Sequence, residues 1–530
     1  MATITITAPS EEVASIFGQS SDNIFGPDPH LEYISNIDGS FATGVNWIDD
    51  DSEDQLLKAV HIYGTPDGQI HFQDYEYTLF VPETYPVQTF SLPDLSGKFL
   101  SFSSEGITFT PDQPLSLLTA TDTFKKSNIA TVLAGDDSIL NYTASGARLN
   151  GYGGNDFIVG GSGADTLNGG TGADKMYGGS GDDYYDVDNN GDRVFEFNGG
   201  GYDTVTTLVN FDAGSQSIEV IRGGVSLTGL RLTGNTFTRE IWGTAKNDLI
   251  SDSLLSNAAV TMSGGAGNDT YVVSSHKDVV IEGAGSAFGY DTVYTSLGYY
   301  TLPDNVEVLR EKEMFFFQGT GNALNNAIHG AGYSDTLDGG AGADQLFGYG
   351  GDDVYYFDNA GDMAVEQVGG GYDLIFSTMN VTKASQNVEA LVFIGVGAFT
   401  GFANATGTAI TGGDGADALV GGAGADTLEG GIGADRLMGA GGADSFIFDV
   451  LGGSPDRVID FQHGLDHVVI DSAVFGDVTT FGGSAPGQAM VGYDAGVLYY
   501  DADGGDHANR IVIATFDGKP GLTAGDFLFV

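Results

Sequence analysis

Aspartate recurs at nine-residue intervals in the glycine-rich part of the sequence, and such spacing could collect carboxylates around metal ions. In the stretch GGAGADTLEGGIGADRLMG (421–439), Asp426 and Asp435 each end the pattern G-G-x-G-x-D. This pattern occurs intact eight times and nearly intact four more times. The twelve aspartates that end it are Asp156, Asp165, Asp174, Asp183, Asp269, Asp335, Asp344, Asp353, Asp417, Asp426, Asp435 and Asp444.

The chemistry of these residues favours calcium. Glycine lets the backbone turn tightly through conformations that are closed to other residues, so alternate carbonyl oxygens can point inward beside the aspartate carboxylate. Hard oxygen ligands in a bendable loop suit Ca²⁺ better than Zn²⁺ or Mg²⁺. We therefore predict that the twelve aspartates are ligands of several calcium ions.

An apolar side chain follows each of the twelve aspartates at the second position. A flexible linker has no reason to keep this position apolar twelve times, so we expect a short strand after each loop, with its central side chain in a core. These side chains are Ile158, Leu167, Met176, Tyr185, Tyr271, Leu337, Leu346, Tyr355, Leu419, Leu428, Leu437 and Phe446.

Two loops and two strands make one coil of 18 residues, and stacked coils pair as parallel strands roughly 4.8 Å apart. Each loop then lies beside the loop 18 residues onward, so an ion can be held between them. The expected couples are Asp156 with Asp174, Asp165 with Asp183, Asp335 with Asp353, Asp417 with Asp435, and Asp426 with Asp444.

This nonapeptide signature resembles the repeats-in-toxin (RTX) family of secreted bacterial proteins, over about residues 131–530. The resemblance implies a calcium-stabilised parallel β-roll and export by a type I secretion system that reads an uncleaved C-terminal signal. Extracellular calcium modules have dissociation constants of about 10⁻⁴–10⁻³ M. The chain would then stay loose in calcium-poor cytosol and fold outside the cell.

A longer repeat contains the nonapeptide blocks. Its marks are GYDTV at 201–205, GYDTV at 289–293 and GYDLI at 371–375, within three tandem units of roughly 80–90 residues. Alternating apolar residues between the blocks indicate that the solenoid continues there. The alternative is separate β-roll modules joined by small β-sandwiches.

Three acidic pairs recur in these units: Asp192 with Glu196, Asp278 with Glu282, and Asp362 with Glu366. Spacing of period two puts both carboxylates of a pair on one face of a strand. Because the pair occurs three times, we interpret it as a structural element rather than a catalytic one.

Proline and glycine divide the chain near residue 130. Nine of the 13 prolines but only 8 of the 83 glycines lie in residues 1–130. We predict an all-β protein with three parts: a small β-rich domain of unknown role (1–130), a β-roll or β-solenoid (131–444), and a β-rich cap (445–530). In the first part, EEVASIF (11–17) could form one or two helical turns, and HIYGTPDGQIHF reads as a hairpin.

Residues 445–530 resemble the cap that follows RTX repeats in secreted proteases and related proteins, and the resemblance implies a secretion signal there. A cap would also cover the open edge of a solenoid. DADGGD (501–506) is either a further calcium turn or a plain acidic turn. The last residues, DFLFV, suit an exposed tail that a transporter recognises.

Composition restricts the partners. The net charge is −53, from 72 acidic and 19 basic residues, and there is no cysteine. Such a surface repels nucleic acid and anionic membranes, and disulfides and thiolate metal sites are excluded. The N-terminus has no basic region and no long apolar run, so we expect neither a cleavable signal peptide nor membrane insertion.

Three functions fit these features. We favour a secreted, non-enzymatic structural protein of the cell surface or extracellular matrix, such as a surface-layer, adhesin or biofilm component, which self-associates through calcium and contacts cell-surface glycans. No H-E-x-x-H or G-x-S-x-G motif occurs. The alternatives are a polysaccharide epimerase or lyase, whose carboxylates no spacing reveals, and a ligand-binding head (1–130) on an RTX tail.

Overall fold

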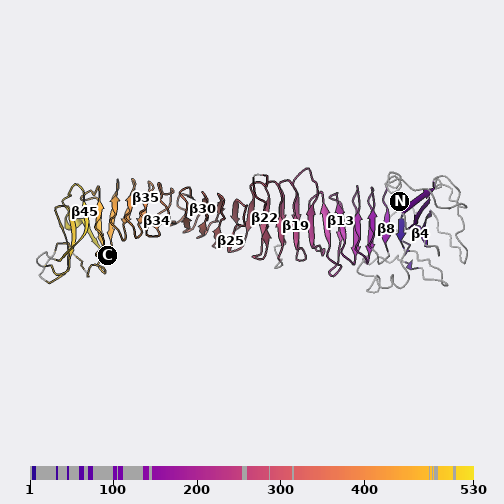
Figure 1. Ribbon diagram of the computed structural model, residues 1–530, viewed down its shortest axis with the longest axis horizontal. Helices are drawn as coiled ribbons and strands as arrows, with labels where there is room; N and C mark the ends of the chain where they lie inside the picture. The colour runs from indigo at the N-terminus through magenta and orange to yellow at the C-terminus, as the bar shows by residue number, and fades with distance from the viewer. Residues whose placement is uncertain are drawn as a thin grey trace. The chain divides into compact units, whose positions relative to one another are not determined.

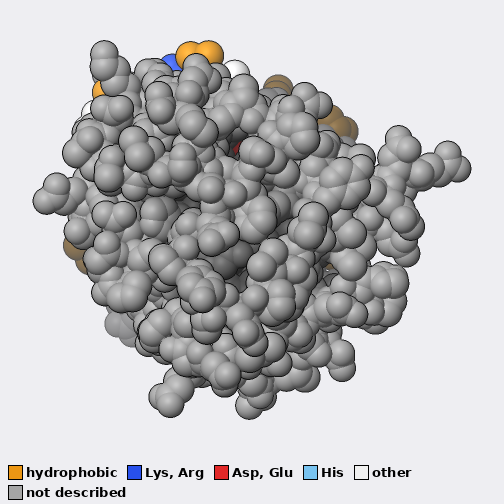
Figure 2. All heavy atoms as spheres, turned by 90° about the vertical axis from the view of Figure 1, so that its right-hand side faces the viewer, with side chains coloured by type: hydrophobic (Ala, Val, Ile, Leu, Met, Phe, Trp, Pro, Cys, Tyr) orange, Lys and Arg blue, Asp and Glu red, His pale blue; other side chains and the backbone are white. Residues whose placement is uncertain are grey.

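The computed structural model describes residues 135–530 except 142–145, 253–258, 286, 313–315, 477, 480, 483–486 and 505–508, together with the backbone of seven short strands before residue 111. Figures 1 and 2 draw the other residues in grey. The segment EEVASIF lies outside the described residues. The early strands are β1 (Thr3–Ile6), β2 (Glu32–Tyr33), β3 (Val45–Asn46), β4 (Ala59–Gly64), β5 (Ile70–Tyr75), β6 (Phe99–Ser103) and β7 (Gly106–Thr110). Strands β4 and β5 pair antiparallel, as HIYGTPDGQIHF predicts.

The chain forms two compact units, which are described separately below. The first contains residues 1–266 and 277–279, and the second contains residues 267–276 and 280–530. The boundary between the two units near residue 266 differs in kind from the predicted boundaries near 130 and 444, which rest on composition. The predicted boundaries therefore stay predictions. Within each unit, Figure 1 shows the strands stacked as successive rungs, such as β13 and β19 in the first and β30 and β34 in the second.

Parallel sheets build the first unit. One sheet contains β1, β8 (Ser138–Asn141), β10 (Phe157–Gly161), β12 (Lys175–Gly179) and β14 (Arg193–Phe195). A second contains β9 (Arg148–Asn150), β11 (Thr166–Asn168), β13 (Tyr184–Val187), β15 (Thr204–Thr207), β17 (Val220–Gly223), β19 (Glu240–Trp242), β21 (Thr261–Ser263) and β23 (Val279–Val280). A further row contains β16 (Phe211–Asp212), β18 (Arg231–Thr233) and β20 (Leu249–Ser251).

Parallel sheets also build the second unit, except that the last three strands of its final sheet pair antiparallel. One row contains β22 (Thr270–Val273), β24 (Thr292–Thr295), β26 (Val308–Glu311), β28 (Ala327–His329), β30 (Gln345–Tyr349) and β32 (Met363–Glu366). Another contains β25 (Tyr299–Thr301), β27 (Gln318–Thr320), β29 (Thr336–Asp338), β31 (Val354–Phe357), β33 (Leu374–Ser377), β34 (Ala390–Phe393), β36 (Ala409–Thr411), β38 (Thr427–Glu429), β40 (Ser445–Phe448), β42 (His467–Ile470) and β46 (Phe527–Phe529). The last contains β35 (Thr400–Phe402), β37 (Ala418–Val420), β39 (Arg436–Met438), β41 (Asp456–Val458), β43 (Met490–Asp494), β44 (Val497–Asp501) and β45 (Arg510–Phe516).

The register confirms the 18-residue coil. Phe157 pairs in parallel with Lys175, and Thr166 pairs in parallel with Tyr184. Between the nonapeptide blocks the strands still pair in parallel, for example β15 with β17 and β24 with β26, so the solenoid continues there and no β-sandwich interrupts it in the described residues. The only helix that the structure describes is the 3₁₀ turn η1 (Ala524–Asp526). The prediction of an all-β parallel solenoid is therefore confirmed.

The core contains the twelve predicted apolar side chains, from Ile158 to Phe446, and none of them has exposed surface. A three-residue strand such as β38 buries only its central residue, Leu428, and leaves its neighbours partly exposed. Full burial of one such side chain is worth about 1.5–3 kcal/mol. The nonapeptide spacing thus places one apolar residue per strand in the core and leaves the loops at the edges of the coils.

The C-terminal residues differ from the predicted exposed tail. β46 pairs in parallel with β42, and Phe527 is only 6% exposed. The expectation is therefore wrong for Phe527, because the strand completes a sheet, whereas Leu528 and Val530 are exposed, at 45% and 70%. In DADGGD, the backbone N–H groups of Asp503 and Gly504 donate to Asp501 Oδ1, as in a plain acidic turn, and Asp506 lies outside the described residues.

Candidate metal centres

The five predicted couples of aspartates are in contact. In each couple, the backbone N–H of the first aspartate donates to Oδ1 of the aspartate 18 residues onward. The N···Oδ1 distances are 2.7 Å for Asp156 with Asp174, 2.7 Å for Asp165 with Asp183, 2.6 Å for Asp335 with Asp353, 2.7 Å for Asp417 with Asp435, and 2.9 Å for Asp426 with Asp444. We call this series of bonds between successive coils the carboxylate ladder.

The twelve predicted aspartates are all buried, with at most 2% of their surface exposed. In most of them the second carboxylate oxygen, Oδ2, is also buried and has no hydrogen-bond partner. A buried polar atom without a partner costs roughly 1–3 kcal/mol, and more when it is charged. Of the twelve, those with such an oxygen include Asp156, Asp165, Asp174, Asp183, Asp344, Asp353, Asp435 and Asp444.

The first glycine of each loop lies where Oδ2 and the next coil approach each other. A Cβ atom at Gly160 would be 2.6 Å from Asp165 Oδ2 and 2.6 Å from the carbonyl oxygen of Gly178. At Gly421 the corresponding distances are 2.6 Å to Asp426 Oδ2 and 2.3 Å to the carbonyl oxygen of Gly439. A carboxylate oxygen and a carbonyl oxygen from successive loops therefore flank the same point, which fits calcium between them.

Three loops differ in one detail. In Asp335, Asp417 and Asp426, Oδ2 accepts a hydrogen bond from a backbone N–H of its own loop, at 2.8, 2.7 and 2.5 Å respectively. A carboxylate oxygen has more than one lone pair, so this bond does not prevent metal binding.

The carboxylates have raised pKa values because they are buried. Burial, reinforced by the charge of neighbouring carboxylates, raises the pKa of Asp156, Asp183 and Asp353 from 3.8 to about 8 in each case. The charged form is therefore unfavourable at neutral pH unless a cation compensates for it.

We predict that acid stabilises the calcium-free protein. Because the folded pKa values are raised, the folded chain binds more protons than the unfolded chain at pH values between 3.8, the ordinary pKa of an aspartate, and about 8. Stability from these groups is therefore full at low pH and is lost as the pH rises through 8. After removal of calcium on a chelating resin, circular dichroism should show more β-structure at about pH 5.5 than at about pH 8. Equal or lower β-structure at the acidic pH would contradict this.

Several members of the carboxylate ladder escaped the sequence prediction. Asp192, Asp203, Asp362, Asp373, Asp291, Asp456 and Asp466 accept the same backbone bond from the coil before them. Most of them end coils of 20–22 residues, so the nine-residue spacing does not reach them. Three of them, Asp203, Asp291 and Asp373, belong to the recurring GYD motif, and this motif could have identified them in the sequence.

The acidic pairs are only partly as predicted. Asp192 and Glu196 are both buried, which agrees with a shared face. They have different contacts, however: Asp192 belongs to the ladder, whereas Glu196 accepts a hydrogen bond from the hydroxyl of Tyr185.

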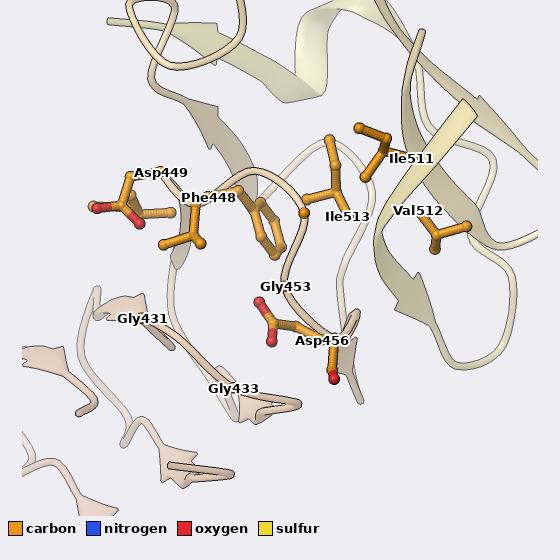
Figure 3. Close-up of a pocket in the computed structure, with 13 residues that line it drawn as sticks. Gly431, Gly433, Phe448, Asp449, Gly453, Asp456, Ile511, Val512 and Ile513 are labelled. Atoms are coloured by element: carbon orange, nitrogen blue, oxygen red, sulfur yellow. The ribbon is translucent and has the colours of Figure 1, made fainter. Parts of the chain in front are cut away.

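Asp456 ends one part of the carboxylate ladder in the second unit. Its Oδ1 accepts the backbone N–H of Asp435 at 3.0 Å, and burial with the nearby charge of Asp435 raises its pKa to about 8. Figure 3 shows its side chain between Gly433 and Gly453, beneath Phe448 and Ile513, with the side chain of Asp449 at the other side of the pocket. Asp456 thus repeats the environment of the nonapeptide aspartates at the start of the C-terminal strands.

Comparison with known proteins agrees with this geometry. A family model, the RTX calcium-binding nonapeptide repeat (4 copies), matches residues 150–185, 320–362 and 411–446. A search of the curated proteins finds no match. Among the described residues, no helix has the length and apolar character needed to span a membrane. The matched ranges contain eleven of the twelve predicted aspartates; the exception is Asp269. The chain therefore contains RTX calcium-binding nonapeptide repeats, in three blocks.

Proposed function

We propose that the protein is a secreted structural component of the bacterial cell surface or extracellular matrix, which folds and assembles when it binds calcium. The observation that carries this proposal is the row of buried carboxylates with unpartnered oxygens in successive coils. With a net charge of −53, the chain repels itself, and divalent cations between its coils offset this repulsion. Calcium outside the cell is then the trigger for folding.

Export by a type I secretion system fits such a chain. At the low calcium concentration of the cytosol, the carboxylates repel one another and oppose folding, so the chain stays loose enough for transport. Outside, calcium at about 10⁻³ M would fill sites of the affinity usual for extracellular modules.

Partly exposed aromatic residues on the outer faces support contacts with other copies or with cell-surface glycans. In the first unit, the rings of Phe157, Tyr177 and Phe195 follow one another on β10, β12 and β14, with centroids 5.2 and 4.2 Å apart. In the second, the rings of Tyr356 on β31 and Phe376 on β33 stack with centroids 5.6 Å apart. Flat aromatic surfaces of this kind bury large area on association.

Assembly of the purified full chain tests the proposal. On addition of calcium at about 10⁻³ M, electron microscopy should show sheets, filaments or coats on cells, and chelation should disperse them. Substitution of Phe157, Tyr177 and Phe195 by serine should reduce assembly without changing the calcium needed for folding. A chain that folds with calcium, remains monomeric and modifies an acidic polysaccharide would instead favour the epimerase or lyase. A ligand captured by residues 1–130 of the full chain would favour the binding-head alternative.

A further inference from the structure

Each long repeat contains a second kind of carboxylate cluster, distinct from the couples of nonapeptide loops. In every cluster, one oxygen from each of three acidic residues lies within 4.8 Å of the other two. The first unit holds Asp183, Glu196 and Asp203. The second unit holds two clusters, which are Asp269, Glu282 and Asp291, and Asp353, Glu366 and Asp373.

Three successive segments contribute to each cluster. Asp183 ends a nonapeptide loop before β13, Glu196 follows β14 and Asp203 precedes β15. Asp203 continues the ladder, because its Oδ1 accepts the backbone N–H of Asp183 at 2.9 Å. The cluster therefore lies where the last nonapeptide coil meets the first coil of different length.

The oxygens converge on a space that a glycine leaves open. A Cβ atom at Gly178 would be 2.1 Å from the hydroxyl oxygen of Tyr185, 2.3 Å from Asp183 Oδ2 and 2.4 Å from Glu196 Oε1. In the third repeat, a Cβ atom at Gly348 would be 2.1, 2.2 and 2.4 Å from the corresponding atoms of Tyr355, Asp353 and Glu366. The same arrangement is thus built twice, in two separate units, around a glycine.

Unpartnered oxygens provide an independent observation that points to a ligand. Asp203 and Asp373 have no exposed surface, and the Oδ2 atoms of both have no hydrogen-bond partner. The same holds for Oδ2 of Asp183 and Asp353, which are at most 2% exposed and point at the glycine space. The hydroxyls of Tyr185 and Tyr355 hold the glutamates by donating to Oε1.

A fourth copy of this region shows which residues the cluster requires. Asp444 and Asp466 correspond to Asp183 and Asp203, but Phe446 replaces the tyrosine. In the strand register Asp460 replaces the glutamate, because Leu437 pairs with Val458 as Met176 pairs with Val194, and each acidic residue follows two places after the valine. Asp460 accepts hydrogen bonds from the backbone N–H groups of Gly439 and Ala440. Among the described residues, no cluster of three acidic groups forms there. The three copies that form a cluster have both the tyrosine and the glutamate, and the fourth copy, which forms none in the described part of the chain, has neither.

We propose that each of the three clusters binds one calcium ion, through two aspartates and the glutamate, in addition to the ions of the nonapeptide loops. Calcium–oxygen distances of about 2.3–2.6 Å place ligand oxygens on opposite sides of the ion about 4.6–5.2 Å apart, and adjacent ones closer. Separations of up to 4.8 Å agree with this range. Each ion would fasten the last nonapeptide coil to the following coil, whose loop has no complete G-G-x-G-x-D pattern.

Counting bound calcium tests the proposal. The triple variant Glu196→Gln, Glu282→Gln and Glu366→Gln keeps the size of each side chain and an oxygen that can accept the tyrosine hydroxyl. Equilibrium dialysis of the full chain, with calcium measured by atomic emission, should show three fewer ions per chain than in the wild type. Each single variant should lose one, which also provides a reading if the triple variant does not fold.

The matched control is Glu219→Gln, Glu307→Gln and Glu389→Gln. These glutamates lie one coil further along and also accept backbone N–H groups, from Asp203, Asp291 and Asp373, but they belong to none of the three clusters. The control should keep the wild-type number of ions. An unchanged count in the first triple variant, or an equal loss in both, would overturn the proposal.

This test is independent of the proposed structural role. If the triple variant loses three ions but still assembles, the clusters bind calcium without being needed for assembly. If the wild type binds the full number of ions but does not assemble, the proposed structural role fails while the cluster sites stand. A second reading is terbium luminescence sensitised by tyrosine. With terbium in place of calcium, Tyr185→Phe, Tyr271→Phe and Tyr355→Phe together should reduce the emission strongly, because these rings are beside the ions; unchanged emission would also count against the clusters.

Discussion

Replacement of both Asp426 and Asp435 by alanine should raise the calcium concentration at the midpoint of folding by more than about tenfold. The two aspartates are in successive loops, and Oδ1 of each accepts a backbone N–H from the coil before it, that of Thr408 for Asp426 and that of Asp417 for Asp435. A hydrogen bond to a charged group contributes about 1.5–3 kcal/mol, and a tenfold change in midpoint corresponds to only about 1.4 kcal/mol. The free energy lost with two buried carboxylates is therefore larger than the free energy that a tenfold change in the midpoint represents.

A calcium titration followed by circular dichroism measures this effect. The control is Asp304→Ala with Asp414→Ala, since both residues are exposed and their replacement removes the same charge from the same unit. The control should move the midpoint slightly downward or not at all, because it only reduces repulsion. An unchanged midpoint in Asp426→Ala with Asp435→Ala would show that these carboxylates are not ligands.

Gly442→Ala should destabilise the calcium-loaded second unit by at least about 3 kcal/mol. Gly442 has a φ of 139°, a conformation that residues with a Cβ atom rarely adopt. Its Cβ atom would also be 1.8 Å from the carbonyl oxygen of Gly424, in the loop of the preceding coil. The two loops would have to separate, which would disturb the couple of Asp426 with Asp444 as well.

Urea unfolding at saturating calcium, compared with Gly298→Ala, tests this prediction. Gly298 lies in the same unit, and nothing is within 4 Å of an added Cβ atom there. Its substitution should change the stability by less than about 0.5 kcal/mol. Similar unfolding of the two variants would mean that the loops do not pack as closely as described.

The nine-residue spacing predicted the fold well because one coil is twice this length. Leu428 and Asp426 illustrate the reason. Asp426 ends a loop, and Leu428 lies two residues later in the short strand that follows. The same two positions recur in the nonapeptide coils, with the apolar side chain in the core and the carboxylate at the edge. Since neighbouring coils differ by 18 residues, contacts between distant positions could be predicted from the spacing alone.

The remaining site residues could not be found in this way. Asp203 is 20 residues after Asp183 and Asp291 is 22 residues after Asp269, so these coils have lost the regular spacing. Glu196 was predicted to share a strand face with Asp192, and only the fold shows that it turns toward Tyr185. The burial of Phe527 was missed for a similar reason, since its partner β42 is distant in the sequence.

The most direct test of the account is a crystal structure of the full chain grown with calcium, with anomalous scattering used to place the ions. The account predicts ions between successive loops, beside the Oδ2 atoms of Asp165, Asp174 and the other nonapeptide aspartates, with carbonyl oxygens of the adjacent coil completing the coordination. Loops that contain no ion at saturating calcium, in a chain folded as described here, would contradict it.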